Sequence, residues 1–315
     1  MEHLSCPACG SVTFTKLEYV DIPKQHAFYA PSDQMRQNQL TQAASTAALN
    51  YQMIGCLNCK LEFANPTIAP SPVWYDIAYQ TLELYPSERW EFLFVLKNIK
   101  KDDKLLELGC GSGEFLKICK NEGIDAVGLD FSPDAIRQCL EAGLDAKILD
   151  LTGNADMETE TKKDVITAFQ VLEHLDKPQT IFEFAKKAAH KNSQLWIAIP
   201  SNLRPSRIFD EHDFLDQPPH HMTRWTEASL KEIGKQAGWE LQKVYYEPLS
   251  ITGSCWWITT RMKLFKSLTS VSSKIPLADR AIRTLLFPFA LFLKYSVYKN
   301  MGGFSMLGLY KPATD

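Results

Sequence analysis

The stretch Lys104–Leu116, KLLELGCGSGEFL, constrains the fold of this chain more than any other segment. An apolar run of leucines ends in the glycine-rich residues Gly109–Gly113, and a helical pattern follows. A buried parallel strand that turns through glycines into a helix is the first half of a nucleotide-binding βαβ unit. Glycine permits the tight turn and lets a ligand lie against bare backbone, while the first N–H groups of the helix attract electron-rich atoms.

The spacing of the glycines indicates which ligand the turn accepts. A dinucleotide turn has the pattern G-x-G-x-x-G, but the third position counted from Gly109 and Gly111 holds Glu114, whose carboxylate would repel a pyrophosphate. The third glycine comes one residue earlier, at Gly113, and Glu107 places a further carboxylate in the strand end. This acidic turn favours a cationic ligand without phosphates and disfavours an oxidoreductase.

Strand and helix patterns alternate after the turn. Seven strands are expected, at residues 105–108, 126–129, 146–149, 165–169, 194–199, 239–246 and 303–310, the last one antiparallel. Helices are expected at residues 132–142, 176–190 and 226–237. This order predicts an α/β fold with a doubly wound sheet, whose ligand crevice lies at the carboxyl ends of the strands. Asp130 ends the second strand about 20 residues beyond the turn, where its carboxylate can accept both ribose hydroxyls.

The turn resembles the first motif of the class I S-adenosylmethionine-dependent methyltransferases, E-x-G-x-G-x-G, at all four defined positions. The resemblance covers about residues 105–246, and the last strand is added after it. It implies a seven-stranded Rossmann-like sheet and S-adenosylmethionine as methyl donor. It also implies that Asp150, beside Leu151, receives the adenine amino group and that Gln170 lines the methionine end. The implied cofactor-binding residues are Glu107, Gly109, Gly111, Gly113, Asp130, Phe131, Asp150, Leu151 and Gln170.

Two C-x-x-C pairs lie near the N-terminus, Cys6 with Cys9 and Cys56 with Cys59. Each pair puts two thiolates on one tight turn, and two such turns complete a four-cysteine shell for a structural zinc ion. The alternative is four unrelated cysteines. Lys60 stands after the second pair, where the usual pattern has glycine. The pairs resemble a methyltransferase subgroup in which a zinc ribbon precedes the catalytic domain and which often acts on sugars or surface polysaccharide precursors.

The chain is expected to contain three segments. Residues 1–66 form a zinc-ribbon-like module with a helical insertion at 34–48, residues 67–102 form a helical lid and linker, and residues 103–315 form the methyltransferase domain. The lid is expected to hold helices at 73–85 and 87–99, the second one capped by Ser87. No secretory signal or membrane-spanning run is visible, so we expect a cytoplasmic protein with thiols rather than disulfides.

Methyl transfer to a hydroxyl requires a base, and histidine is the side chain best suited to this role at neutral pH. His220 and His221 lie in the loop after the fifth strand, which emerges at the carboxyl edge of the sheet. Either one is a candidate base, and the alternative is a structural pair. His174, after the fourth strand, is the third candidate, with a role in orienting the loop as its alternative.

Residues 255–300 form a basic and apolar insert within a longer one at about 251–302. They contain eight Lys or Arg residues and one acid, Asp279, although the whole chain has a formal net charge of −3, which does not indicate nucleic-acid binding. Such a segment can lie on the anionic inner face of a membrane, cap a phosphate-bearing acceptor, or form a helical hairpin packed on protein.

The sequence therefore predicts an enzyme that transfers a methyl group from S-adenosylmethionine to a hydroxyl of a small or carrier-linked acceptor. A sugar or polysaccharide precursor is the preferred class, which follows from the subgroup resemblance. One alternative is a sugar C-methyltransferase, and another is a non-enzymatic S-adenosylmethionine-binding regulator that docks a protein through its zinc module. The acceptor, the methylated atom and the oligomeric state are left open.

Overall fold

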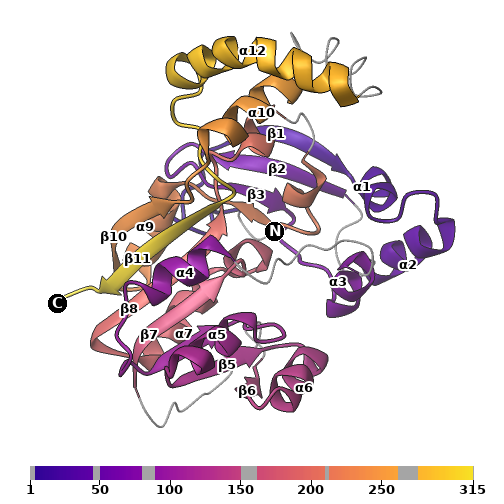
Figure 1. Cartoon of the computed structure of the whole chain (residues 1–315). Coiled ribbons are helices and arrows are strands. Elements are labelled where there is room, and N and C mark those ends of the chain that lie inside the picture. Colours follow the sequence, from indigo (N-terminus) through magenta and orange to yellow (C-terminus); the bar gives the residue numbers. More distant parts are fainter. Residues whose placement is uncertain are drawn as a thin grey trace. The chain divides into compact units, whose positions relative to one another are not determined.

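The computed structural model describes residues 4–44, 50–79, 89–149, 162–209, 213–261 and 276–314. The chain divides into two compact units (Figure 1). The first contains Met1–Pro200, Phe214–Tyr245 and Leu307–Asp315, and the second contains Ser201–Asp213 and Tyr246–Met306. The predicted boundaries at residues 66 and 102 stay predictions.

A seven-stranded mixed sheet confirms the predicted α/β Rossmann-like architecture. Its strand order is β10-β11-β8-β7-β4-β5-β6, so the chain enters in the middle at β4 and builds outward in both directions. β4 pairs in parallel with both β5 and β7, which brings the carboxyl ends of these strands to one edge. The strands are β4 (Leu105–Leu108), β5 (Ala126–Asp130), β6 (Asp145–Ile148), β7 (Lys163–Phe169), β8 (Ala189–Pro200), β10 (Trp239–Tyr246) and β11 (Ser305–Pro312).

The helices between these strands begin where the sequence supplies a suitable cap. Ser132 accepts a hydrogen bond from the backbone of Ala135, and Thr226 forms a capping box with Ser229. The helices α6 and α7 contact the strands on either side of them in sequence, and α5 contacts β5, as expected of a βαβ arrangement. These elements are α5 (Glu114–Glu122), α6 (Pro133–Glu141), α7 (Gln179–Ala188) and α9 (Glu227–Gln236).

Two predicted helices have wrong boundaries. The helix expected at 176–190 ends at Ala188, because Ala189 pairs with Lys163 and the Ser193 hydroxyl donates to the Lys163 carbonyl oxygen, which extends β8 toward its start. The helix expected from Ser87 is α4 (Trp90–Leu96), whose N-cap Arg89 has an extended backbone.

The core of the first unit is aromatic. Phe92, Phe115, Phe169 and Trp196 are buried together. The rings of the three phenylalanines all contact one another, with centroids 4.9 to 5.1 Å apart. These residues come from α4, α5, β7 and β8, so the helix after the glycine turn is fixed against the sheet by packing.

The N-terminal residues form a second, four-stranded sheet with the order β1-β2-β3-β9. Its last strand, β9 (Thr223–Arg224), belongs to the loop that carries His220 and His221, and it pairs with Glu62 and Phe63. The N-terminal module is therefore bonded to the catalytic domain through its own sheet. Its elements are β1 (Phe14–Asp21), α1 (Ile22–Tyr29), α2 (Gln34–Ala44), β2 (Asn50–Cys56) and β3 (Glu62–Asn65), and α3 (Pro72–Tyr79) follows.

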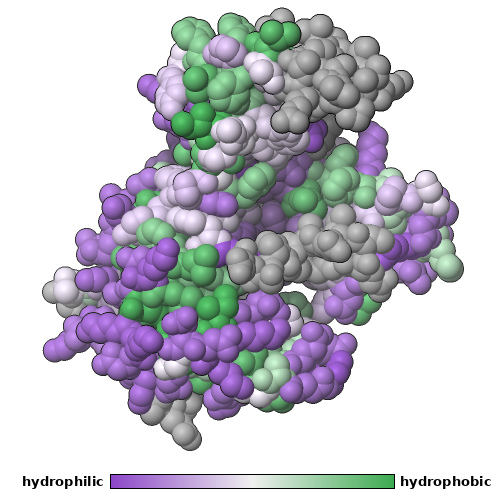
Figure 2. Space-filling view, viewed as in Figure 1, coloured by the Kyte–Doolittle hydropathy of each residue, from purple (hydrophilic) through white to green (hydrophobic). Residues whose placement is uncertain are grey.

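The second unit is a helical assembly of α8 (Pro205–Phe209), α10 (Ile251–Arg261) and α12 (Pro276–Ser296). Ile258 and Ala290 are buried between α10 and α12. The outer side of α12 exposes further apolar residues, and Figure 2 shows apolar side chains in green over this helix. In the described part of the chain, no helix combines the length and apolar character needed to cross a bilayer.

Candidate functional site

The glycine turn after β4 uses its three glycines for different purposes. Gly109, Gly111 and Gly113 all have positive φ angles, of 76°, 52° and 82°. A Cβ at Gly109 would lie 2.4 Å from a Val171 methyl group, and one at Gly113 would lie 2.6 Å from a Leu144 methyl group. A Cβ at Gly111 would meet nothing within 4 Å. Gly111 is thus the open side of the turn, where a ligand can reach the backbone.

Asp130, at the end of β5, holds the backbone of the turn at Gly111 in place. Its carboxylate accepts hydrogen bonds from the Gly111 N–H at 2.8 Å and from the Ser132 N–H at 2.9 Å. Burial raises the pKa of Asp130, although these backbone N–H groups oppose the rise. The neighbouring Phe131 side chain is 46% exposed, so an aromatic face is available beside the acid.

Glu107 is the buried acid of the turn. Its side chain is 3% exposed, and its Oε2 atom has no hydrogen-bond partner. Burial raises the pKa of Glu107 well above its usual range, and the nearby Asp130 carboxylate raises it further. A carboxyl group of this kind is stabilised by a cationic ligand, so the acids and the open backbone fit the sulfonium nucleoside implied by the sequence.

Gln170 follows β7 with a φ angle of 56°, which a residue other than glycine rarely adopts. Its backbone N–H donates to the Ala198 carbonyl oxygen, and its side-chain amide donates to Glu91 Oε1 at 3.3 Å. Backbone strain of this kind is often found at binding sites. The structure thus places Gln170 at the same strand edge as Glu107, through the parallel pairing of β4 with β7.

Two residues of this edge were not predicted, Glu91 and Arg89. Glu91 is buried, and its Oε1 atom lies 3.9 Å from an Arg89 guanidinium nitrogen. The Arg89 charge also opposes the rise in the pKa of Glu107. Their position in the helix before β4 gives no motif that would single them out. Asp150 and Leu151 lie outside the described residues, so their role stays a prediction.

The three candidate histidines meet in one cluster, in which His220 and His221 are buried and His174 is half-buried. One ring nitrogen from each of His174, His220 and His221 lies within 4.8 Å of the other two. His220 and His221 are stacked with ring centroids 4.3 Å apart, and His174 stands edge-on to His221 at 4.8 Å. Since His174 ends the short 3₁₀ helix η1 (Leu172–His174) after Gln170, the cluster lies at the carboxyl edge of the sheet.

Each of the three rings is oriented by an oxygen atom. His174 Nδ1 donates to the His220 carbonyl oxygen at 2.7 Å, and His220 Nδ1 donates to the Leu215 carbonyl oxygen at 2.7 Å. His221 Nδ1 lies 3.1 Å from Asp216 Oδ1. Burial lowers the pKa of His174 to about 3 and lowers that of His220 well below its usual range, so both rings are neutral at neutral pH.

Glu173 and Tyr75 complete the surroundings of the cluster. Glu173 is 1% exposed, and Tyr75 places its ring edge-on to His174 with its hydroxyl 3.4 Å from the His220 carbonyl oxygen. Glu173 could have been suspected from its place beside His174 in the sequence. Tyr75 is 99 residues away from His174 in the chain, and only the fold brings the two together.

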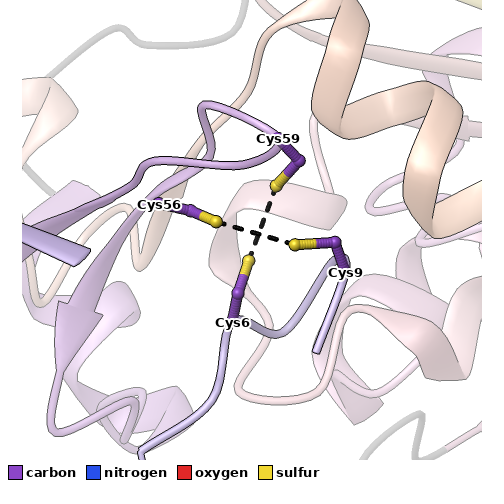
Figure 3. A group of neighbouring side chains, drawn as sticks. All are labelled: Cys6, Cys9, Cys56 and Cys59. Atoms are coloured by element: carbon purple, nitrogen blue, oxygen red, sulfur yellow. Dashed lines mark hydrogen bonds between the residues drawn. The ribbon is translucent and has the colours of Figure 1, made fainter. Parts of the chain in front are cut away.

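The four N-terminal cysteines converge on one point (Figure 3). The Sγ atoms of Cys6 and Cys59 are 3.6 Å apart, as are those of Cys9 and Cys56. Sulfur atoms about 2.3 Å from a tetrahedral zinc ion lie about 3.8 Å from one another, so the arrangement fits that ion.

Lys60 takes the backbone conformation that glycine has in the first cysteine turn. Gly10 and Lys60 have φ angles of 68° and 65°, and their N–H groups donate to the carbonyl oxygens of Cys6 and Cys56. The departure from glycine therefore leaves the turn unchanged. The Lys60 ammonium donates to the Leu57 carbonyl oxygen at 2.7 Å, which ties the side chain to the same turn.

The seven-stranded sheet and the acidic glycine turn at its carboxyl edge define a class of protein, the S-adenosylmethionine-dependent methyltransferases. Residues 83–244, half of the chain, match the family model described as "Methyltransferase domain". The chain belongs to this family.

Several known proteins are similar to the chain. The ubiquinone biosynthesis O-methyltransferase of Aliivibrio fischeri (strain MJ11) is 21% identical over 204 residues, which are 58% of this chain and 85% of that protein. The mitochondrial ubiquinone biosynthesis O-methyltransferase of Schizosaccharomyces pombe is 25% identical over 194 residues, which are 56% of this chain and 71% of that protein. A solved S-adenosylmethionine-dependent methyltransferase from Archaeoglobus fulgidus is 18% identical with a TM-score of 0.49, covering 76% of this chain and 99% of that one. The family assignment rests on the family model.

Replacing Glu107 with Gln is expected to stabilise the ligand-free protein at neutral pH. The pKa of Glu107 in the folded protein lies above its value of about 4.3 in the unfolded chain, so this carboxyl supports folding most below pH ~4 and loses that contribution as the pH rises. Glutamine has no proton to lose. The free energy of unfolding of the variant should therefore exceed that of the native protein by on the order of 1–2 kcal/mol at pH 7, and the difference should vanish near pH 4. Denaturant unfolding at several pH values measures it.

The same substitution should weaken S-adenosylmethionine binding roughly tenfold if Glu107 is the acid that stabilises the cation, as the sequence predicts. Isothermal titration calorimetry checks this affinity. The matched control is Glu122→Gln, at the exposed end of α5, which should change neither quantity. If the free energy of unfolding changed with pH in the same way in Glu107→Gln and in the native protein, Glu107 would not be a buried acid with a raised pKa.

Proposed function

We propose that this methyltransferase acts on a hydroxyl of a small or carrier-linked acceptor, with a sugar or polysaccharide precursor as the preferred class and a sugar carbon as the second. The observation that carries the proposal is the position of the histidine cluster beside the cofactor turn. Val171, which begins the segment leading to His174, packs directly on Gly109. The ubiquinone biosynthesis relatives are O-methyltransferases, which supports oxygen as the acceptor atom. The sugar class rests on the subgroup resemblance of the cysteine pairs.

S-adenosylmethionine supplies the methyl group from its sulfonium. In the proposed complex Asp130 binds the ribose hydroxyls, the open backbone at Gly111 and the exposed Phe131 ring border the nucleoside, and Gln170 lines the methionine end. Asp150 and Leu151 complete the adenine site. What this chain adds to the chemistry is the orientation of an acceptor hydroxyl and the removal of its proton.

His221 is the proposed base in the protein without a bound cation. Its Nδ1 atom faces Asp216 Oδ1, so a proton gained on Nε2 would be stabilised by the carboxylate behind the ring. His220 is oriented by a neutral carbonyl oxygen and packs among Tyr29, Trp74 and Tyr75, which makes it the second candidate. His174 is the third.

A His221→Gln variant should lose methyl transfer by about 100-fold or more while its affinity for S-adenosylmethionine stays the same, because only the proton acceptor is removed. Transfer of a labelled methyl group to a panel of nucleotide-linked sugars measures turnover, and mass spectrometry of the product distinguishes O- from C-methylation. His190→Gln is the matched control, since His190 pairs with Asp164 at the start of β8, away from the carboxyl edge. Turnover at the native rate in His221→Gln would show that this histidine is not the base.

We propose that the four cysteines hold a structural zinc ion. Four thiolates fill a tetrahedral shell and leave no open position for a substrate. Cys6, Cys56 and Cys59 are buried, and all eight cysteines are free of disulfides in the structure. Because β9 belongs to the same sheet as β2, this ion would also steady the strand that follows His221.

Cys56→Ser should lose one zinc ion per chain and lower the free energy of unfolding by at least ~2 kcal/mol, since the metal supports the folded module. Metal analysis of the purified protein and denaturant unfolding measure the two effects. The control is Cys255→Ser, which removes a buried thiol from the second unit and should leave the zinc content unchanged. Equal zinc content in both variants would refute a cysteine-bound ion.

We also propose that α12 contacts an anionic membrane surface at the inner face, while the protein itself is cytoplasmic. Leu285, Phe289 and Phe292 recur at helical spacing on one side of α12 and are 79%, 45% and 63% exposed. The sequence around them is strongly basic, which suits an anionic interface.

Co-sedimentation with phosphatidylglycerol vesicles tests this contact. Binding should weaken as the salt concentration rises, and it should fall at least about tenfold when Leu285 and Phe292 are replaced by Glu, because the charges prevent insertion of the apolar face. Leu140→Glu is the control, since Leu140 is 57% exposed on α6. Vesicle binding that is absent, or equal in all three proteins, would remove the membrane proposal.

A further inference from the structure

In all three rings of the histidine cluster the Nδ1 atom faces an oxygen atom. A site with a single catalytic base does not require this. The acceptors at the Nδ1 atoms of His174 and His220 are carbonyl oxygens, which accept but never donate, so these nitrogens carry protons. Asp216 faces the corresponding atom of His221. In the neutral rings the lone pair then lies on Nε2.

This arrangement is typical of histidines that bind a metal ion. A metal-binding imidazole coordinates through one nitrogen and donates the other N–H to a backbone carbonyl or a carboxylate, which fixes the ring and raises its basicity. Two carbonyl oxygens and one carboxylate provide these contacts here. One nitrogen from each ring already lies within 4.8 Å of the others without an ion.

Glu173 gives the second, independent observation. Both of its carboxylate oxygens are buried without a hydrogen-bond partner, and Oε1 lies 4.0 Å from His174 Nε2. A buried carboxyl group without a hydrogen-bond partner is unfavourable, and a bound cation is one of the few groups that would compensate its ionised form. The carboxylate therefore lies at the edge of the imidazole cluster, where its negative charge would stabilise a cation bound by the three rings.

We propose that His174, His220 and His221, with Glu173 beside them, bind a divalent transition-metal ion. Imidazole and carboxylate ligands suit zinc and its neighbours, and three histidines leave an open coordination position, unlike the four-cysteine site. The catalytic part of this inference rests on the proposed function. In the loaded protein His221 would be a ligand instead of the base. The ion would lower the pKa of an acceptor hydroxyl at its open position, and the hydroxyl proton would pass to solvent water.

Metal analysis after dialysis against buffered zinc chloride tests the proposal without donor or acceptor. The native protein should hold one more zinc ion per chain than His174→Gln, and Glu173→Gln should bind that ion at least about tenfold more weakly. His190→Gln, the matched histidine control, should retain the native content. Circular dichroism and thermal unfolding show whether each variant is folded. If His174→Gln does not fold, the weaker zinc binding of Glu173→Gln still tests the proposal.

Cobalt(II) gives a second readout. The native protein should gain visible bands that His174→Gln lacks, while thiolate charge-transfer bands from the cysteine site are equal in both. Identical zinc content and cobalt spectra in the native protein and both cluster variants would overturn the metal site. Zinc uptake with no methyl transfer to any sugar nucleotide would keep the site and reject the acceptor, whereas methyl transfer without uptake would reject the site alone.

Discussion

The position of the histidine loop depends on the buried guanidinium of Arg224. It lies 2.7 Å from Glu18, 3.2 Å from Glu62 and 3.0 Å from Asp216, and its side chain is 8% exposed. Two of these carboxylates belong to the N-terminal sheet and the third belongs to the loop. Because separating such charges inside the protein is strongly unfavourable, Arg224 fixes the loop to the module. Asp216 in turn orients His221.

The N-terminal module therefore has a structural connection to the candidate acceptor site. β9 extends the module's sheet directly after His221, and the Met222 N–H donates to the Glu173 carbonyl oxygen. A zinc ion in the cysteine turns would stabilise this sheet, and through it the histidine cluster. This gives a physical reason for placing a cysteine module in front of a methyltransferase domain.

The two halves of the site differ in how they are built. The candidate cofactor half is local, since Glu107, Gly109 and Gly111 lie within five residues and Asp130 is brought to them by one parallel strand pairing. Its buried acids favour a cation. The histidine half gathers residues from α3, η1 and the loop after η2 (Phe214–Asp216), and its rings are oriented mainly by backbone oxygens. A short motif can encode the first kind of site, but the second requires a complete fold.

The sequence by itself determined the seven-stranded sheet, because glycine turns, acidic strand ends and helix caps are set by neighbours along the chain. It also predicted that the two C-x-x-C pairs form one four-cysteine shell, and it gave the three histidines as separate candidates for the base. Only the tertiary structure decided that the histidines share one cluster, that Glu173 and Tyr75 border it, and that β9 joins the N-terminal sheet. The reason is physical: these contacts join residues far apart in the chain, and their carbonyl acceptors belong to the backbone, which leaves no signature in the side-chain pattern.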